Sequence, residues 1–192
     1  MSDKKTLREL KSLHEDVLRI IHEADDAEAA PVPSSRIQSR LESIERTGRD
    51  NLLQVVKYYL YEGREIFDME NALVAAFRGD NYVVTAAVTD LPVVENMIFK
   101  ICDTYCSEIY TSGNTYTIQD VASTAGGLSH PVYQNLKLRA YIGAPIFIGE
   151  RLYGSVSFSS QSPRTDFLGY EKRAVEFLAR LIGSCLSDGE TQ

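Results

Sequence analysis

Thiol and imidazole side chains within residues 102–130 are the first candidates for chemistry. Cys102 and Cys106 lie four residues apart, so on a helix they would share one face. Together with His130 they could form a metal or redox site. The spacing is not that of a zinc knuckle, and buried free cysteines commonly act as small hydrophobic side chains. We therefore expect no metal site, while redox chemistry stays open as an alternative.

His130 precedes Pro131 in a small, polar, turn-prone stretch, residues 120–135. An imidazole in this position could contact a ligand, bind haem or titrate near neutral pH. Alternatively, it helps to cap the turn before Pro131. Residues 120–135 are expected to be mobile, and both interpretations of His130 stay open.

Polar and aromatic side chains around the same stretch suit a pocket for a planar ligand. Ordinary half-buried packing would explain the tyrosines equally well, and solvated loop charges would explain Asp120 and Arg139. No phosphate loop, metal-ligand run or Ser/His/Asp order indicates catalytic residues, so we expect binding rather than enzymatic activity. The candidate ligand-binding residues are Tyr105, Cys106, Tyr110, Asp120, His130, Tyr133, Arg139, Tyr141, Ser155 and Ser157.

A central hairpin is predicted over residues 136–160, where two alternating apolar runs meet at Gly149-Glu150. Glycine at the first central position suits a two-residue type II′ turn. This turn would set Phe147 opposite Leu152, Gly143 opposite Val156 and Tyr141 opposite Phe158. The other face would then be mixed and could line a cavity; it comprises Ile142, Ala144, Ile146, Ile148, Arg151, Tyr153, Ser155 and Ser157.

Hydrophobic spacing predicts the elements that must position this hairpin. We expect an α+β domain with a central antiparallel sheet of about five to six strands and its terminal helices on one face. The domain spans 34–188, after an amphipathic helix and acidic Pro-containing linker over 1–33 and before a polar tail, 189–192. The predicted elements are helices over 6–24 and 35–68, a hairpin of 71–77 with 82–88, a short helix from Asp103, a strand over 116–118 and a last helix capped at Thr165 or Asp166.

The composition limits the classes of partner. A chain of 192 residues with 44% hydrophobic content fits one domain plus an appendage. A formal net charge of −7 argues against nucleic acid and membrane as partners. Three cysteines, a charged segment over 2–16 and the lack of an apolar run near the roughly 20 residues of a membrane helix predict a cytoplasmic location.

The terminal helices carry more apolar surface than one sheet contact requires. Heptad-like spacing in the first helix favours a partner helix, although it also fits a helix that folds back on its own domain. We expect a homodimer whose interface uses Leu7, Leu10, Val17, Ile21, Leu41, Ile44, Val175, Ile182 and Leu186.

An ordered series of motifs resembles the GAF domains of bacterial sensor kinases, cyclases and response regulators. The series is DTYC at 103–106, HPVY at 130–133, YIGAP at 141–145, YGSVSFSS at 153–160 and PR at 163–164. The resemblance covers about residues 34–187. It implies a central sheet with terminal helices on one face and a small-molecule pocket on the other, roofed by residues 101–138. It also implies dimerisation through the terminal helices and signalling to an output domain.

The resemblance also bears on the cofactor. Some GAF domains hold a bilin through a cysteine immediately before a histidine that corresponds to His130. Ser129 occupies that position here, so no covalent bilin is expected and the ligand stays undefined. Three functions remain: a small-molecule sensor, a ligand-free dimerisation or docking module, and a Cys-dependent oxidoreductase of the methionine sulfoxide reductase type.

Overall fold

The computed structural model describes residues 49–189. Several predictions lie outside this range: the helix over 6–24, the helix start at Ser35 and the interface residues that precede residue 49. Within the range, the predicted hairpins and the strand over 116–118 are confirmed.

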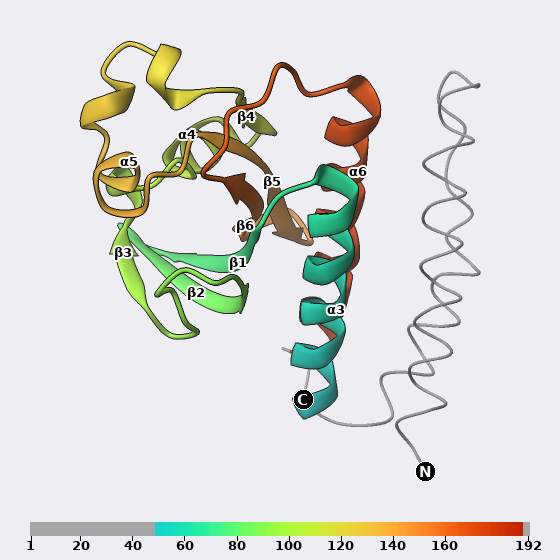
Figure 1. Cartoon of the computed structure of the whole chain (residues 1–192). Helices are drawn as coiled ribbons and strands as arrows, with labels where there is room; N and C mark the ends of the chain where they lie inside the picture. Colours follow the sequence, from blue (N-terminus) through green and yellow to red (C-terminus); the bar gives the residue numbers. More distant parts are fainter. Residues whose placement is uncertain (1–48, 190–192) are drawn as a thin grey trace.

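A six-stranded antiparallel sheet forms the centre, in the order β3-β2-β1-β6-β5-β4, which confirms the α+β prediction. The long helices α3 and α6 cover one face, and short helices gather on the other (Figure 1). The elements are α3 (Arg49–Phe67), β1 (Asn71–Arg78), β2 (Asn81–Val88), β3 (Ile98–Lys100), η2 (Ile101–Asp103), α4 (Ser107–Ser112), β4 (Tyr116–Ile118), η3 (Val121–Ser123), η4 (Gly127–Ser129), α5 (Pro131–Leu136), β5 (Ala140–Ile148), β6 (Arg151–Ser160) and α6 (Gly169–Gly189).

The central hairpin of β5 and β6 contains a bulge that the sequence analysis missed. Phe147 pairs with Leu152 as predicted, but Ile146 pairs with Gly154, which leaves Tyr153 as an extra residue. A bulge of one residue reverses the face of every residue beyond it. The other two predicted pairings are therefore wrong: Gly143 pairs with Ser157 rather than Val156, and Tyr141 pairs with Ser159 rather than Phe158.

The bulge redistributes the side chains of β6 between the two faces. Val156 and Phe158 are fully buried in the core beneath α3 and α6. Because side chains alternate along a strand, Ser155 and Ser157 point to the opposite face, which they share with Tyr141. The predicted mixed face is thus split, and its serines lie opposite the helices.

Residues 91–113 differ from the predicted loop and helix. The chain first adds β3 to the edge of the sheet and then makes the single turn η2. At Thr104 the backbone is extended, with φ −119° and ψ 154°, so α4 starts only at Ser107 and Asp103 does not cap it. Cys102 and Cys106 consequently do not share a helical face.

The start of α6 also differs from the prediction. Asp166 Oδ1 accepts a hydrogen bond from the backbone N–H of Phe167, and the helix begins three residues after Asp166, at Gly169. Glu171 Oε2 accepts from the backbone N–H of Leu168, at 2.8 Å. A carboxylate in the first turn therefore satisfies the N-terminal donor, as in one half of a capping box.

No helix within residues 49–189 is both long and apolar enough to cross a bilayer.

The contact between α3 and the sheet depends on Gly63. A Cβ atom at this position would lie 2.2 Å from the ring of Phe158, which is fully buried and packs against Phe67 at 4.7 Å between ring centroids. Glycine weakens a helix interior, but here it lets the helix approach the sheet closely.

Gly63→Ala is expected to lower the free energy of unfolding by up to about 2 kcal/mol. Overpacking typically costs about 1–3 kcal/mol, and the better helix propensity of alanine offsets only about 1 kcal/mol of this. Urea denaturation measures the change. Gly169→Ala is the control, because its Cβ would approach only Arg173 Nη1, at 3.3 Å. Equal stability of both variants would contradict the close approach.

Candidate functional site

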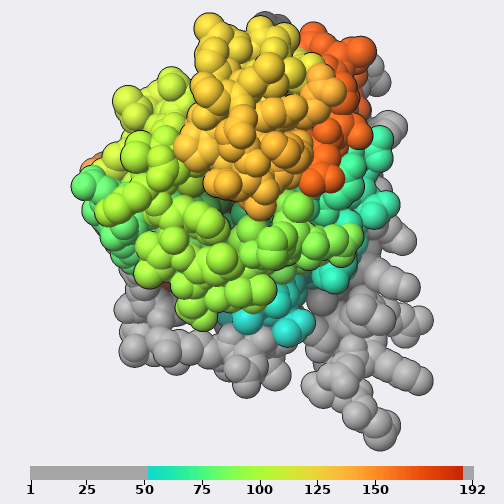
Figure 2. Space-filling view, turned by 60° about the vertical axis from the view of Figure 1, so that its left-hand side comes forward, coloured from blue at the N-terminus to red at the C-terminus, as the bar shows by residue number. Residues whose placement is uncertain are grey.

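Residues 101–138, here called the roof, lie on the side of the sheet opposite α3 and α6 (Figure 1). They form much of the surface that Figure 2 shows. The roof and the sheet enclose a second apolar core between them. Its buried members include Tyr82 and Val84 from β2, Tyr141 from β5, and Tyr105, Cys106 and Ile109 from the roof.

A group of buried polar side chains lies within this core. The Tyr141 hydroxyl is 3.1 Å from Cys106 Sγ. The phenol of Tyr82 lies beside Cys106, Ser155 and Ser157, all of which are buried. We call these five residues the hydroxyl–thiol cluster. It contains no charged side chain.

Burial dominates the electrostatics of the cluster. It raises the pKa of both Tyr82 and Tyr141 well above the usual value, and the adjacent Cys106 thiol adds to the rise. The hydroxyls of Ser157 and Ser155 act in the opposite direction on the pKa of Tyr82. Both phenols are therefore neutral at physiological pH and can donate as well as accept hydrogen bonds.

Ser155 differs from the other members of this cluster in its hydrogen bonding. Its side chain is fully buried, and its Oγ has no hydrogen-bond partner in the structure. The Tyr82 phenol lies close enough for the Ser155 hydroxyl to lower its pKa, but the pair does not reach full hydrogen-bond geometry. An unsatisfied buried polar group costs about 1–3 kcal/mol, so Ser155 is where a bound molecule would gain most by supplying a partner.

Gly143 fixes the position of the Tyr141 ring. A Cβ atom on Gly143 would lie 2.3 Å from the Tyr141 hydroxyl and 2.9 Å from Cδ1 of Ile109. The phenol therefore lies close over the strand, where any other residue would displace it. The close approach of the Tyr141 ring to Gly143 places the Tyr141 hydroxyl beside Cys106 Sγ.

His130 has the structural role that was one of its two predicted interpretations. Its Nδ1 accepts a hydrogen bond from the backbone N–H of Val132, at 3.2 Å, and so caps α5. Its ring lies 4.7 Å from the ring of Tyr105, whose hydroxyl donates to the Leu138 carbonyl, at 2.8 Å. Burial lowers the pKa of His130, and the charge of Asp103 partly opposes this.

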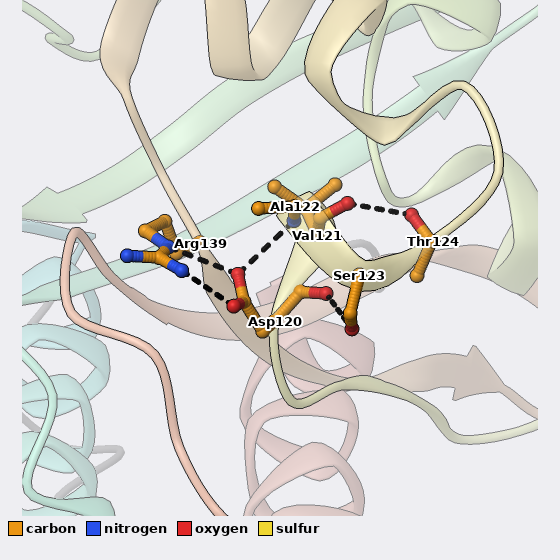
Figure 3. A network of polar contacts seen from close by, with 6 residues as sticks. All are labelled: Asp120, Val121, Ala122, Ser123, Thr124 and Arg139. Carbon is orange, nitrogen blue, oxygen red and sulfur yellow. Dashed lines mark hydrogen bonds and ion pairs between the residues drawn. The ribbon is translucent and has the colours of Figure 1, made fainter.

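Asp120 and Arg139 form a bidentate pair at the base of the roof (Figure 3). Arg139 Nε donates to Asp120 Oδ1, at 2.9 Å, and Nη2 donates to Oδ2. The same carboxylate caps η3 by accepting from the backbone N–H of Ala122, at 3.0 Å. The hydrogen bonds from Arg139 lower the pKa of Asp120. The pair is half-exposed and holds the roof to the start of β5.

The remaining candidates lie away from the cluster. Tyr110 is exposed and packs edge-on against Phe77, at 5.2 Å between ring centroids. Tyr133 is half-buried, with Lys137 Nζ 5.2 Å from its ring centroid. The structure therefore brings together Cys106, Tyr141, Ser155 and Ser157, places Tyr105 and His130 beside them, and leaves Tyr110, Asp120, Tyr133 and Arg139 at the periphery.

The cysteines do not form a shared site. Cys102 is exposed beside Asp103, whereas Cys106 is buried against Tyr141. In the part of the chain that the structure describes, no three His, Cys, Asp or Glu side chains gather as metal ligands.

Two of the residues proposed for the dimer interface lie inside the protomer. Val175 and Ile182 are fully buried in the core beneath the helices, and Leu186 is half-buried beside it. A partner helix on α6 would therefore contact neighbouring positions rather than Val175 or Ile182.

Sequence analysis did not select Tyr82, Ile109 or Gly143 for the site. Tyr82 starts an alternating strand directly after a hairpin turn, and the pairing of β2 with β1 places it on the roof face. That alternation was a usable signal for Tyr82. The close approach at Gly143 depends on the Tyr141 rotamer, which no sequence pattern reveals.

A sheet with a helix pair on one face and a roofed polar cluster on the other defines a class of small α+β domain. The sequence profile of the GAF domain matches residues 51–186. This chain belongs to the GAF family. A search of curated proteins found no match.

Solved structures share this fold at low sequence identity. The phycoerythrobilin-bound GAF domain of a cyanobacterial phytochrome is 15% identical, with a TM-score of 0.64, covering 84% of this chain and 98% of that one. The free methionine-R-sulfoxide reductase of Neisseria meningitidis, in complex with its substrate, is 14% identical, with a TM-score of 0.62 and coverage of 85% and 96%. The GAF domain of an Acinetobacter phosphoenolpyruvate-protein phosphotransferase is 8% identical, with a TM-score of 0.62 and coverage of 93% and 95%.

The cap at α5 predicts a pH dependence of stability. Protonation of Nδ1 would remove the acceptor for Val132, and the pKa of His130 in the folded protein is below its ordinary value of 6.5. This contribution to stability is therefore complete above that value and is lost as pH falls from it toward the folded pKa.

The melting temperature of the unmodified chain should fall more steeply below about pH 6.5 than that of His130→Asn. Asparagine keeps an N-cap acceptor but does not titrate in this range. Scanning calorimetry at a series of pH values compares the two chains. Parallel curves for both would show that the cap does not depend on His130 protonation.

Proposed function

We propose that this domain is a cytoplasmic sensor that binds a small molecule at the hydroxyl–thiol cluster and signals through α3 and α6. The observation that carries the proposal is the fully buried Ser155 hydroxyl without a partner. An enclosed polar group of this kind gains a hydrogen bond when a ligand reaches it, so the empty domain is less stable than the occupied one.

The chemistry of the cluster indicates the character of the ligand. Its donors and acceptors are phenols, hydroxyls and a thiol, and no charged side chain belongs to it. A charged group placed here would lose its hydration without a counter-ion. The charged pair of Asp120 and Arg139 satisfies itself at the base of the roof. We infer a ligand whose buried end is neutral, flat and able to form hydrogen bonds.

Signalling requires that occupancy changes the packing of the terminal helices. The strands offer a direct connection, because β1 and β6 carry the roof-side core on one face and the helix-side core on the other. Ser155 and Val156 illustrate this, since adjacent residues of β6 face the cluster and the helices respectively. We propose that the signal passes to an output domain or protein through a homodimer of these helices.

Close packing around Tyr141 supports a second candidate, a ligand-free dimerisation or docking module. Ile109 is fully buried, and Gly143 leaves no room between its backbone and the Tyr141 ring. Such a domain would hold its roof closed permanently. It would tolerate changes in the hydroxyl–thiol cluster with effects on stability alone.

The proposed role is binding rather than catalysis. A reactive cysteine needs an accessible thiol, and the Cys106 thiol of the cluster lies buried against the Tyr141 phenol. The resemblance to a methionine sulfoxide reductase at 14% identity concerns the fold alone.

Native mass spectrometry of the purified full-length chain should detect a co-purified small molecule. A thermal-shift panel of purines, cyclic nucleotides, amino acids and tetrapyrroles tests binding directly. For a binder found in either way, Tyr141→Phe should weaken affinity about three- to tenfold, as expected for one lost hydrogen bond.

Tyr153→Phe is the matched control, because it removes the same group from the opposite face of the sheet. Its affinity should equal that of the unmodified chain. If no compound binds, or if both phenylalanine variants bind equally well, the cluster is not the binding site and the docking module is favoured.

Sedimentation of the full-length chain should show a dimer at high micromolar concentration. Leu10→Glu would place a charge at a predicted interface position of the first helix and should shift the equilibrium toward monomer. A monomer at the highest concentration of the unmodified chain would refute the homodimer.

A further inference from the structure

The connector, residues 161–168, joins β6 to α6 and runs between the roof and the start of that helix (Figure 1). It is attached to the roof at both of its ends. Gln161 Nε2 donates to the Leu136 carbonyl, at 2.9 Å, and Gln119 Nε2 donates to Asp166 Oδ1, at 3.4 Å. Between them, the backbone N–H of Arg164 donates to the Gln119 carbonyl, at 2.8 Å.

The side chain of Arg164 extends in the opposite direction, toward both terminal helices. Nη1 donates to the carbonyl of Phe67, the last residue of α3. Nη2 lies 2.9 Å from Oε1 of Glu171 in the first turn of α6, an ion pair rather than an aligned hydrogen bond. The guanidinium also lies over the ring of Phe167, 4.8 Å from its centroid.

Glu171 makes this arrangement sensitive to displacement. The residue is only 1% exposed, and its other oxygen caps the start of α6 at Leu168. A buried carboxylate is tolerated only with a partner of opposite charge, and loss of that partner is strongly destabilising. A small movement of Arg164 would therefore change the packing at the start of α6 and the end of α3 together.

We propose that Arg164 couples the roof to the terminal helices. Its backbone N–H is hydrogen-bonded to the carbonyl of Gln119, the residue before Asp120 of the Asp120–Arg139 pair. Its side chain contacts the end of α3 and the start of α6. Arg164 thus acts as a positioning residue. The proposed sensor function is needed only to say that ligand binding is the natural stimulus; the coupling itself does not depend on it.

A second contact between the roof and α6 does not involve Arg164. Thr115 Oγ1 donates to Glu176 Oε1 of α6, at 2.8 Å, next to the start of β4. Removal of the Arg164 side chain should therefore reduce the coupling without abolishing it.

The test applies a defined perturbation to the roof and measures the helices without any ligand. A Cβ atom at Gly127 would lie 1.9 Å from the Val121 carbonyl oxygen, so Gly127→Ala must displace η3 or η4. Hydrogen exchange is followed in two sets of peptides, over 64–69 and over 168–174. It reports the local opening equilibrium at each helix end.

With Arg164 present, Gly127→Ala should speed exchange at both helix ends by about threefold or more, within the range seen for residues coupled in one network. In an Arg164→Gln background the same change should speed it less than about twofold, although the roof peptides respond as before. Arg164→Lys should reduce the response as Arg164→Gln does, because an ammonium group cannot contact Phe67 and Glu171 with the geometry of a guanidinium. The lysine variant replaces the glutamine variant in the test if Arg164→Gln unfolds the chain.

Arg180→Gln is the matched control, since Arg180 also lies over an aromatic ring, that of Phe177, and faces solvent. It should leave the response to Gly127→Ala unchanged. Two results would overturn the proposal: no response at the helix ends when Arg164 is present, or effects of Gly127→Ala and Arg164→Gln that simply add. Either result is independent of whether a small molecule binds at the hydroxyl–thiol cluster.

Discussion

One extra residue in a strand decides what the central sheet presents to each side. The bulge at Tyr153 turns Val156 and Phe158 toward the helices and leaves Ser155 and Ser157 facing the roof. Without it, the strand would bury its serines against α3 and α6 and present its large apolar groups to the cluster. A bulge is a local irregularity with a long-range effect, because each residue beyond it changes face.

The two cores that result have different chemical character. The helix-side core is closely packed and mostly apolar, as the contact of Gly63 with the Phe158 ring illustrates, although it also buries the Tyr59 and Tyr153 phenols, and the Tyr59 hydroxyl has no hydrogen-bond partner. The roof-side core gathers its phenols, thiol and serine hydroxyls into one cluster, in which the Ser155 hydroxyl is unsatisfied. Buried polar groups without full hydrogen bonding lower stability, and in folded proteins they are retained mainly where a function uses them. This clustering of polar groups on one face is the basis of the proposal that the roof side binds and the helix side signals.

Sequence patterns predicted elements and fold class well, since alternation in β1, β2 and β5 and the glycine turns are local properties. They failed where contacts between residues distant in sequence decide the strand register or the formation of a strand. The bulge at Tyr153 follows from pairing with two neighbouring strands, and β3 forms only because the edge of β2 is available. For the site, the residue types at Tyr141 and Cys106 were informative, whereas Gly143 and Arg164 gain their roles from rotamers and tertiary contacts.

The most direct test of the binding role is an experimental electron-density map of the protein as purified or soaked with a compound from the panel. The proposal predicts non-protein density under the roof, with an atom within hydrogen-bond distance of Ser155 Oγ. A well-defined map in which protein side chains alone surround Ser155, under every condition tried, would contradict it and leave the domain as a docking module.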